Sequence, residues 1–172
     1  PGVSEKDFVK ACMLSSESDT TPEGKSIMEL AYERGVRSRN LVVSGDHLIR
    51  FSAETRTSGI NLADGTEIRK GAYEAIRKLV ESAGNSFPSE VEQVIVNVSA
   101  GGGTPLVVCI NRKTIGVIEL QDIIKPGIHE RFDRLRKMGV KTVMVTGDNP
   151  LTAQYIADKA GVDDYIAEAK PE

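Results

Sequence analysis

Apolar residues recur every three or four positions in several stretches of the chain, and this spacing predicts amphipathic helices. Two of these stretches begin with a capping signal, because the side chains of Ser4 and Thr21 can accept hydrogen bonds from the first free N–H groups. Pro22 strengthens the second signal, since proline suits the first helical position. The first four helices are expected over residues 4–14, 21–35, 73–83 and 88–100.

Other stretches alternate apolar and polar residues, which is typical of half-buried strands. One such stretch runs from Phe51 to Gly71, where the turn Ala63-Asp64-Gly65 predicts two antiparallel strands that bring Phe51 and Lys70 towards each other. Two further hairpins are expected, and the long apolar runs of the second are typical of central strands. These hairpins pair residues 41–43 with 47–51, and residues 105–110 with 114–120.

The pattern changes after residue 120, where Pro126 and Gly127 mark a break. A helix, a strand, a second helix and a second strand are expected at residues 128–138, 140–145, 150–160 and 162–166. The strand–helix–strand order predicts a parallel pair, which is part of a Rossmann-like sheet. We therefore predict an α+β fold, with an antiparallel sheet flanked by helices over residues 1–120 and an incomplete Rossmann-like α/β piece over residues 121–172.

Composition and charge narrow the classes of function. A formal net charge of −3 argues against a dedicated nucleic-acid binder, because such a protein carries a basic face. No apolar run reaches the roughly 18 residues that a membrane-spanning helix needs. Cys12 and Cys109 lie among apolar neighbours and fit no metal-ligand spacing, which favours buried, reduced thiols and no metal site. Arg69 and Lys70 are expected on the solvated surface from their residue types alone.

The stretch from Phe51 to Gly71 also carries the candidate chemistry. Phe51 offers an aromatic face, residues 52–58 offer hydroxyl groups, and Lys70 precedes a glycine that has no side chain to keep a ligand from the backbone. Such groups can make a nucleotide pocket, in which the ring stacks on a base and the cation meets phosphate charge. The residue types also allow another interpretation, with Phe51 in the core and Lys70 in a solvated turn.

The same stretch resembles the nucleotide-binding domain of the catalytic subunit of the potassium-transporting P-type ATPases. The matching residues are Phe51-Ser52-Ala53, Arg56, Ser58-Gly59-Ile60-Asn61 and Arg69-Lys70-Gly71. A Thr-Pro-Glu-Gly segment also occurs in that family, where its Glu and an upstream Asp line the nucleotide site; helix capping is the alternative role for these two residues. The resemblance implies that ATP is bound by Asp19, Glu23, Phe51, Ser52, Ala53, Glu54, Thr55, Arg56, Thr57, Ser58, Lys70 and Gly71.

A second resemblance lies in the C-terminal piece. Thr146-Gly147-Asp148 follows an apolar strand and precedes a helix that starts with proline, and it resembles the phosphorylation-domain motif of P-type ATPases. In that family the Thr and Gly contact the transferred phosphoryl group, and a hinge motif that Asp122 resembles lies near the phosphates. The alternative interpretation is capping of the next helix by Asp148 or Asn149.

Two motifs of the family are absent from this sequence: Asp-Lys-Thr-Gly-Thr, which carries the phosphorylated Asp, and Gly-Asp-Gly-x-Asn-Asp, which holds Mg²⁺. The resemblance therefore implies a nucleotide-binding domain with a fragment of the phosphorylation domain, which holds no catalytic residue and is inactive alone. Its partners would be ATP, with Mg²⁺ in the parent enzyme, the other domains of the pump and the potassium-conducting subunit. The parent would place this part at the cytoplasmic face of the membrane.

Other functions are weighed against this one. The heavy-metal P-type ATPases carry Ser-Glu-His-Pro where this chain has Ser16-Glu17-Ser18-Asp19, which disfavours a copper or zinc pump. A stand-alone phosphohydrolase would need an aspartate nucleophile after a strand, and none stands in that context. A non-catalytic nucleotide-binding or protein-interaction module stays open as the alternative.

Overall fold

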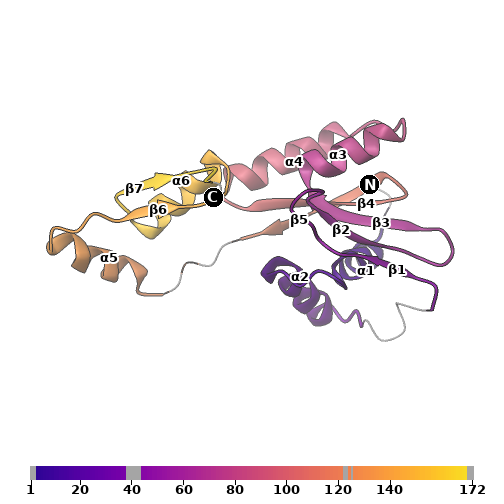
Figure 1. Ribbon diagram of the computed structural model, residues 1–172, viewed down its shortest axis with the longest axis horizontal. Coiled ribbons are helices and arrows are strands. Elements are labelled where there is room, and N and C mark those ends of the chain that lie inside the picture. Colours follow the sequence, from indigo (N-terminus) through magenta and orange to yellow (C-terminus); the bar gives the residue numbers. More distant parts are fainter. Residues whose placement is uncertain (1–2, 38–43, 122–123, 125, 170–172) are drawn as a thin grey trace. The chain divides into compact units, whose positions relative to one another are not determined.

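The computed structural model describes residues 3–37, 44–121, 124 and 126–169. They divide into two compact units, of which the first comprises Pro1–Ile95 with Pro105–Ile118 and the second Val96–Thr104 with Glu119–Glu172 (Figure 1). Among the residues described, no helix is both long enough and apolar enough to cross a membrane. The predicted α+β class is confirmed.

The first unit is built on a five-stranded sheet with the order β1-β2-β3-β4-β5. The strands are β1 (His47–Ile49), β2 (Thr57–Asn61), β3 (Glu67–Ala72), β4 (Thr104–Ile110) and β5 (Lys113–Leu120). The β4–β5 connection is two residues long, and both Asn111 and Arg112 have positive φ, as tight hairpin turns require. The pairing of β2 with β3 places Ser58 opposite Lys70, which sets the geometry of the site described below.

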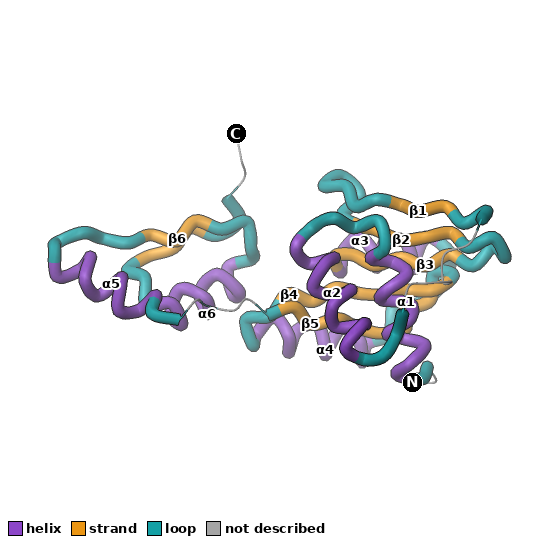
Figure 2. Tube along the Cα trace, turned by 90° about the horizontal axis from the view of Figure 1, so that it is seen from below, coloured by secondary structure: helices purple, strands orange, loops and turns teal. Residues whose placement is uncertain are grey.

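Helices cover both faces of this sheet. Figure 2 shows α1 (Glu5–Ser16) and α2 (Pro22–Glu33) on one side, with α3 (Tyr73–Ser82) and α4 (Ser89–Ala100) on the other. Because side chains alternate along a strand, neighbouring residues of β3 face opposite layers. Val107 and Cys109 pack with Ile76, Val80 and Ile95 between the sheet and the α3–α4 layer.

The helix termini follow the capping signals. Ser4 accepts a hydrogen bond from the Asp7 N–H and Thr21 from the Gly24 N–H, as predicted. The first helix continues to Ser16, two residues beyond its predicted end, and the buried Ser15 and Ser16 satisfy their hydroxyls by donating to carbonyls of the preceding turn. The prediction of two buried free thiols is confirmed.

Three strand predictions need correction or fall outside the described residues. Phe51 lies beyond the end of β1, in the loop before β2, and is not paired in the sheet. The last strand β5 stands at an edge of the sheet rather than at its centre. The predicted strand at residues 41–43 lies outside the described residues.

Arg69 and Lys70 are buried, at 9% and 2% exposure, so the expectation of a solvated pair was wrong.

The second unit contains α5 (Ile128–Lys137), β6 (Val143–Val145), α6 (Pro150–Ala160) and β7 (Asp164–Ile166). Strands β6 and β7 pair in parallel, as predicted. Asp163 links the two strands to α5, because it accepts hydrogen bonds from the Thr142 N–H, just before β6, and from Arg136 on α5. These bonds lower the pKa of Asp163 to about 2.

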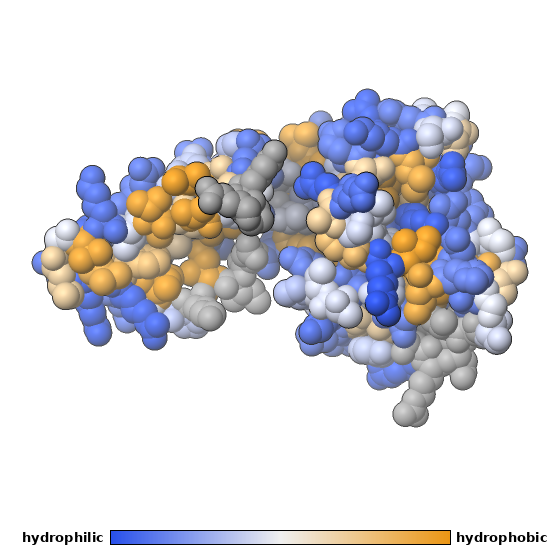
Figure 3. Space-filling view, in the orientation of Figure 1, coloured by the Kyte–Doolittle hydropathy of each residue, from blue (hydrophilic) through white to orange (hydrophobic). Residues whose placement is uncertain are grey.

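We expect amides of β6 and β7 to exchange faster with solvent than those of β4, because a two-stranded sheet buries little surface. Val143, Val145 and Ile166 are each more than half exposed, and Figure 3 shows apolar surface over this unit. Hydrogen exchange measured by mass spectrometry on a monomeric sample checks this. Uniformly slow exchange over residues 143–166, equal to that of β4, would contradict the expectation.

Candidate functional site

Three segments that are distant in sequence meet at one end of the sheet in the first unit. The Ser18 hydroxyl donates to the Ile49 carbonyl at 3.0 Å, which ties the α1–α2 loop to the end of β1. The Arg56 carbonyl accepts the Ala72 N–H at 3.2 Å, which ties the loop after β1 to the end of β3. The predicted binding residues 19, 51–58 and 70–71 are therefore held next to one another.

The Lys70 ammonium forms an ion pair with Asp19 at the centre of this region. Nζ lies 2.7 Å from Asp19 Oδ2, and the two side chains are 2% and 4% exposed. Burial alone would raise the pKa of Asp19, but the hydrogen bonds from Lys70 and Thr21 outweigh it and hold that pKa below its ordinary value. Lys70 is therefore paired with Asp19 within the protein. The residue types alone did not predict this pair.

Phe51 presents its ring to solvent. It is 45% exposed and does not belong to either layer of the core, so the interpretation of Phe51 as a core residue is wrong. The loop that carries it is closed by the Ser52 carbonyl, which accepts the Arg56 N–H at 2.8 Å, and by Ser52 Oγ, which accepts the Thr55 N–H. Arg56 has φ 51°, a left-handed conformation that is uncommon for a residue with a side chain. A half-exposed ring on a closed loop can stack on a planar ligand.

Gly71 has a packing role in this loop. A Cβ at this position would meet the Arg56 carbonyl and would lie 2.8 Å from Thr57 Cγ2. Because Gly71 has no side chain, the end of the Phe51 loop, at Arg56 and Thr57, can pack against β3. This is a different reason for glycine from the one that the sequence suggested, which was approach of a ligand to the backbone.

Gly71→Ala is expected to destabilise the protein by about 1–3 kcal/mol, because overpacking forces the backbone apart. Thermal melts measure this effect. Gly101→Ala is a suitable control, since a Cβ there would have its nearest contacts at 3.5 Å. Unchanged stability in Gly71→Ala would contradict the packing role.

The start of α2 contributes Thr21 and Glu23. Thr21 caps the helix, and its own N–H and hydroxyl donate to Asp19 Oδ1 at 3.1 and 2.6 Å. Asp19 therefore both organises the helix start and pairs with Lys70. Glu23 is exposed in the first turn, close to the positive end of the helix dipole. From the sequence, Thr21 was predicted only as a helix cap. The feature that could have indicated its bond to Asp19 is the Asp-x-Thr-Pro spacing.

Arg69 is a second residue whose role the sequence did not reveal. Its guanidinium donates to the carbonyls of Ile60 and Ile68 and to the side chain of Asn61. It lies across Gly59, where a Cβ would be 2.9 Å from Arg69 Cδ. This network fixes the register of β2 against β3. In the sequence, the feature that could have indicated it is Gly59, two residues before Asn61.

The predicted phosphate-side residues lie in the second unit, apart from Asp122, which lies outside the described residues. Thr146 Oγ1 and Asp148 Oδ2 are 2.7 Å apart in the turn after β6, and Gly147 stands between them. Asn149, not Asp148, caps α6, through a hydrogen bond from the Thr152 N–H. The capping interpretation therefore holds for Asn149 and leaves the Asp148 carboxylate in the turn.

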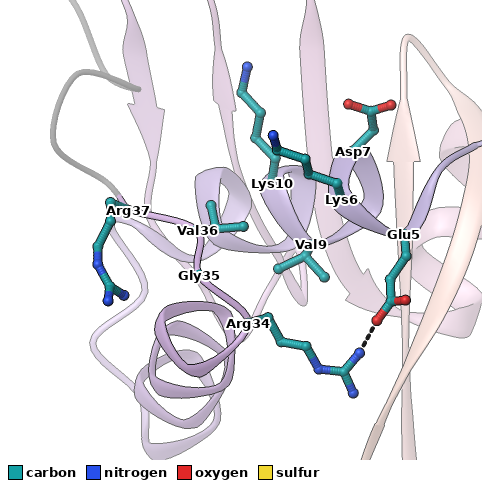
Figure 4. Close-up of a pocket in the computed structure, with 9 residues that line it drawn as sticks. All are labelled: Glu5, Lys6, Asp7, Val9, Lys10, Arg34, Gly35, Val36 and Arg37. Carbon is teal, nitrogen blue, oxygen red and sulfur yellow. Dashed lines mark hydrogen bonds and ion pairs between the residues drawn. The ribbon is translucent and has the colours of Figure 1, made fainter.

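A cavity of about 710 Å³ lies elsewhere in the first unit, between the start of α1 and the end of α2 (Figure 4). Charged side chains dominate its lining, and Arg34 and Glu5 form an ion pair there. No aromatic residue and none of the predicted binding residues lines it. The cavity therefore offers no ring on which a planar ligand could stack. Within the described part of the chain, no cluster of three His, Cys, Asp or Glu could hold a metal ion.

Comparison with known proteins gives close relatives over nearly the whole chain. The potassium-transporting ATPase ATP-binding subunit of Caldanaerobacter subterraneus subsp. tengcongensis is 48% identical over 171 residues, which are 99% of this chain and 25% of the relative. The subunit of the same name from Serratia proteamaculans is 53% identical over 173 residues, again 25% of its length. The chain thus spans about a quarter of these relatives.

Solved structures agree on the fold. A zinc-transporting PIB-type ATPase in the E2.Pi state superposes with a TM-score of 0.62 and 22% identity, over 98% of this chain and 25% of that chain. The catalytic CPx-ATPase domain CopB-B superposes with a TM-score of 0.61 and 13% identity, over 98% and 53%. Residues 6–172 match the family described as "Hydrolase: haloacid dehalogenase-like hydrolase". The chain therefore belongs to the haloacid dehalogenase-like hydrolases.

Proposed function

We propose that this chain is the ATP-binding part of a potassium-transporting P-type ATPase, and that Phe51 and its loop receive the base of ATP. The observation that carries the proposal is the half-exposed Phe51 ring on a loop whose Arg56 carbonyl is hydrogen-bonded to the end of β3, the strand that carries Lys70. The names of the relatives, which are ATP-binding subunits of potassium-transporting ATPases, support it. Stacking of a base on an aromatic ring contributes about 1–3 kcal/mol, which gives moderate affinity to an open site.

Each group at the site has a role in this proposal. The Phe51 ring stacks on the base, and Ser52, Thr55 and Thr57 supply hydroxyls along the loop. Arg56, which is exposed, supplies a cation on the outer side of the loop, where phosphate groups can reach it. The sequence of this chain holds neither the phosphorylated Asp segment nor the segment for Mg²⁺. The γ-phosphate would therefore react at an Asp in another part of a longer protein.

The longer protein would supply the remaining parts of the reaction. Its phosphorylation domain would complete the piece that carries Thr146, Gly147 and Asp148, which would lie on the phosphate side. Mg²⁺ would accompany ATP there, and this part would work at the cytoplasmic face of a membrane with a potassium-conducting subunit. A non-catalytic nucleotide-binding module is the alternative, and potassium-dependent ATP turnover by the full-length protein distinguishes the two.

An NMR titration of the ¹⁵N-labelled chain with ATP tests the proposal. Amide shifts are expected at Phe51, Lys70 and Gly71, and at residues of the 52–58 loop. Shifts confined to the cavity between α1 and α2 would overturn the assignment of the site. Absence of any saturable shift at millimolar ATP would overturn ATP binding by this chain.

We expect ATP and ADP to bind with similar affinity and no phosphate to be released. The reason is that the proposed contacts are mainly with the base, while the acceptor Asp and the Mg²⁺ segment are absent from the sequence. Parallel titrations and a phosphate-release assay measure both quantities. Mg²⁺-dependent turnover that Asp148→Asn abolishes and Asp64→Asn leaves intact would instead favour a stand-alone phosphohydrolase.

A further inference from the structure

The outer side of α5 carries a concentration of positive charge that the proposed ATP site does not use. Between Ile128 and Lys141 the sequence has five Arg or Lys residues against two Asp or Glu residues, while the whole chain has a net charge of −3. Arg131, Arg134 and Lys137 are exposed and follow one another at intervals of three, so they lie on one side of the helix. Lys141, which is also exposed, follows shortly after the helix ends.

The fifth cation, Arg136, has a different role, because it faces the rest of the unit. Its guanidinium donates hydrogen bonds to Asp133, to Asp163 and to the Gly161 carbonyl. In the part of the chain that the structure describes, no carboxylate pairs with the other four cations, which are Arg131, Arg134, Lys137 and Lys141. These four charges are therefore available to an anionic partner from outside the chain.

The helix ends in an apolar turn that is exposed between two of these cations. Met138 is 75% exposed and Val140 is 45% exposed. Backbone hydrogen bonds hold the turn, because the Val140 N–H donates to the Leu135 carbonyl and the Gly139 N–H to the Arg136 carbonyl, both at 3.0 Å. We call the whole surface the α5 face; it consists of Arg131, Arg134, Lys137, Met138, Val140 and Lys141.

The helix dipole explains only part of this pattern. Basic residues in the last turn stabilise a helix C-terminus, which accounts for Arg134 and Lys137. The dipole does not account for Arg131 near the middle of the helix, for Lys141 beyond its end, or for the exposed Met138 beside them. A second cause is needed for cations and apolar side chains that share one exposed surface.

A bilayer surface with anionic lipids matches both parts of the α5 face. Apolar side chains can enter the interface while Lys and Arg side chains meet the headgroups. A soluble polyanion such as a nucleic acid would leave the apolar turn unused, and the net charge of −3 on the whole chain disfavours it. The combination of charge and exposed apolar side chains therefore favours a membrane over a soluble polyanion.

We propose that the α5 face docks on a bilayer surface that contains anionic lipids, with Met138 and Val140 in the interface and the four cations against the headgroups. Each Lys or Arg near such a surface strengthens binding by about fivefold. The docking involves no nucleotide, so it goes beyond the proposed function. It places the second unit, through α5, at a membrane surface.

The first test measures binding of the unmodified chain to lipid vesicles by cosedimentation. Vesicles of phosphatidylglycerol mixed with phosphatidylcholine are compared with vesicles of phosphatidylcholine alone, at low and high salt. Binding is expected to be at least about tenfold stronger to the anionic vesicles and to weaken steeply with salt, because exposed charges are screened. Equal binding to both kinds of vesicle, or no binding to the anionic ones, would overturn the proposal.

The second test removes two cations from the α5 face. Arg134→Gln/Lys137→Gln should weaken binding to anionic vesicles by about 25-fold. Lys6→Gln/Lys10→Gln makes the same change of net charge at two exposed lysines of α1, and should leave binding close to that of the unmodified chain. Equal losses in the two double variants would show that net charge determines binding, and would overturn the role of the α5 face.

A second pair of substitutions guards against loss of the helix. Arg131→Gln/Lys141→Gln leaves the basic residues of the last turn in place, so the helix C-terminus keeps its favourable charges. It should also weaken vesicle binding by about 25-fold, with an unchanged circular dichroism spectrum. Unchanged binding in this variant would overturn the proposal even if Arg134→Gln/Lys137→Gln does not fold.

Met138→Ser distinguishes a membrane from a soluble polyanion. It should weaken vesicle binding by about fivefold or more, because the apolar side chain no longer enters the interface. Polyphosphate that binds the chain as tightly as the anionic vesicles do, together with unchanged vesicle binding in Met138→Ser, would overturn the proposal in favour of a polyanion site. Phe51→Ala should bind vesicles as the unmodified chain does, so a failure of vesicle binding and a failure of ATP binding are separate results.

Discussion

Lys70→Met is expected to lower the free energy of unfolding by about 3–5 kcal/mol, because it leaves the Asp19 carboxylate buried without its partner. The pair is almost completely shielded from water, so solvent does little to compensate for the loss. Methionine preserves most of the volume of the side chain, which separates the effect of charge from that of a cavity. Denaturant unfolding of the two proteins at neutral pH measures the difference.

The pH dependence of this difference identifies its cause. Asp19 in the unmodified protein has a pKa below its ordinary value of 3.8, so the stability that it contributes is present above that value and is lost as the pH falls through the lowered pKa. In Lys70→Met, burial without the cation should raise the pKa of Asp19, and acid should relieve the penalty. The two stabilities should therefore converge as the pH falls towards 4, and a difference that is constant with pH would contradict the charge argument. Glu81→Gln, at an exposed pair, should change stability by about 0–1 kcal/mol.

Phe51→Ala is expected to weaken ATP binding by about 1–3 kcal/mol, the value of one base stacked on an aromatic ring, which is roughly 5- to 150-fold in affinity. The fold should survive, because the ring is 45% exposed and does not contribute to the core. Truncation of a buried Phe would instead cost about 3–5 kcal/mol of stability. Thermal melts together with ATP titrations measure the two quantities.

Matched variants sharpen this experiment. Phe51→Tyr keeps an aromatic face and should retain most of the affinity. Tyr32→Ala removes another partly exposed aromatic residue, at 38% exposure on α2, and should leave ATP binding unchanged. A large loss of thermal stability in Phe51→Ala without a change in affinity would mean that the ring supports the fold and not the ligand.

Much of the local structure follows from the sequence because its causes are local. The caps at Ser4 and Thr21 depend on a side-chain oxygen and an N–H three residues away, and both are present as predicted. The β4–β5 hairpin and the parallel β6–β7 pair also follow from nearby turn residues and from chain order. Phe51 and Lys70 were identified as candidates from residue type and from family resemblance, and whether they bind a nucleotide stays a prediction.

Tertiary structure alone decided which of these residues are buried, exposed or paired. Lysine is usually a surface residue, yet Lys70 is buried in β3, where its ammonium pairs with Asp19 from the α1–α2 loop. An aromatic ring is usually core, yet Phe51 stays exposed because its loop leaves the sheet after β1. The burial of Lys70 depends on a bond between segments 51 residues apart, and no local pattern carries that information. The sequence by itself therefore determined the helices and strands and the candidate chemistry. The fold decided that the Lys70 ammonium is buried and paired with Asp19, and that the Phe51 ring is exposed.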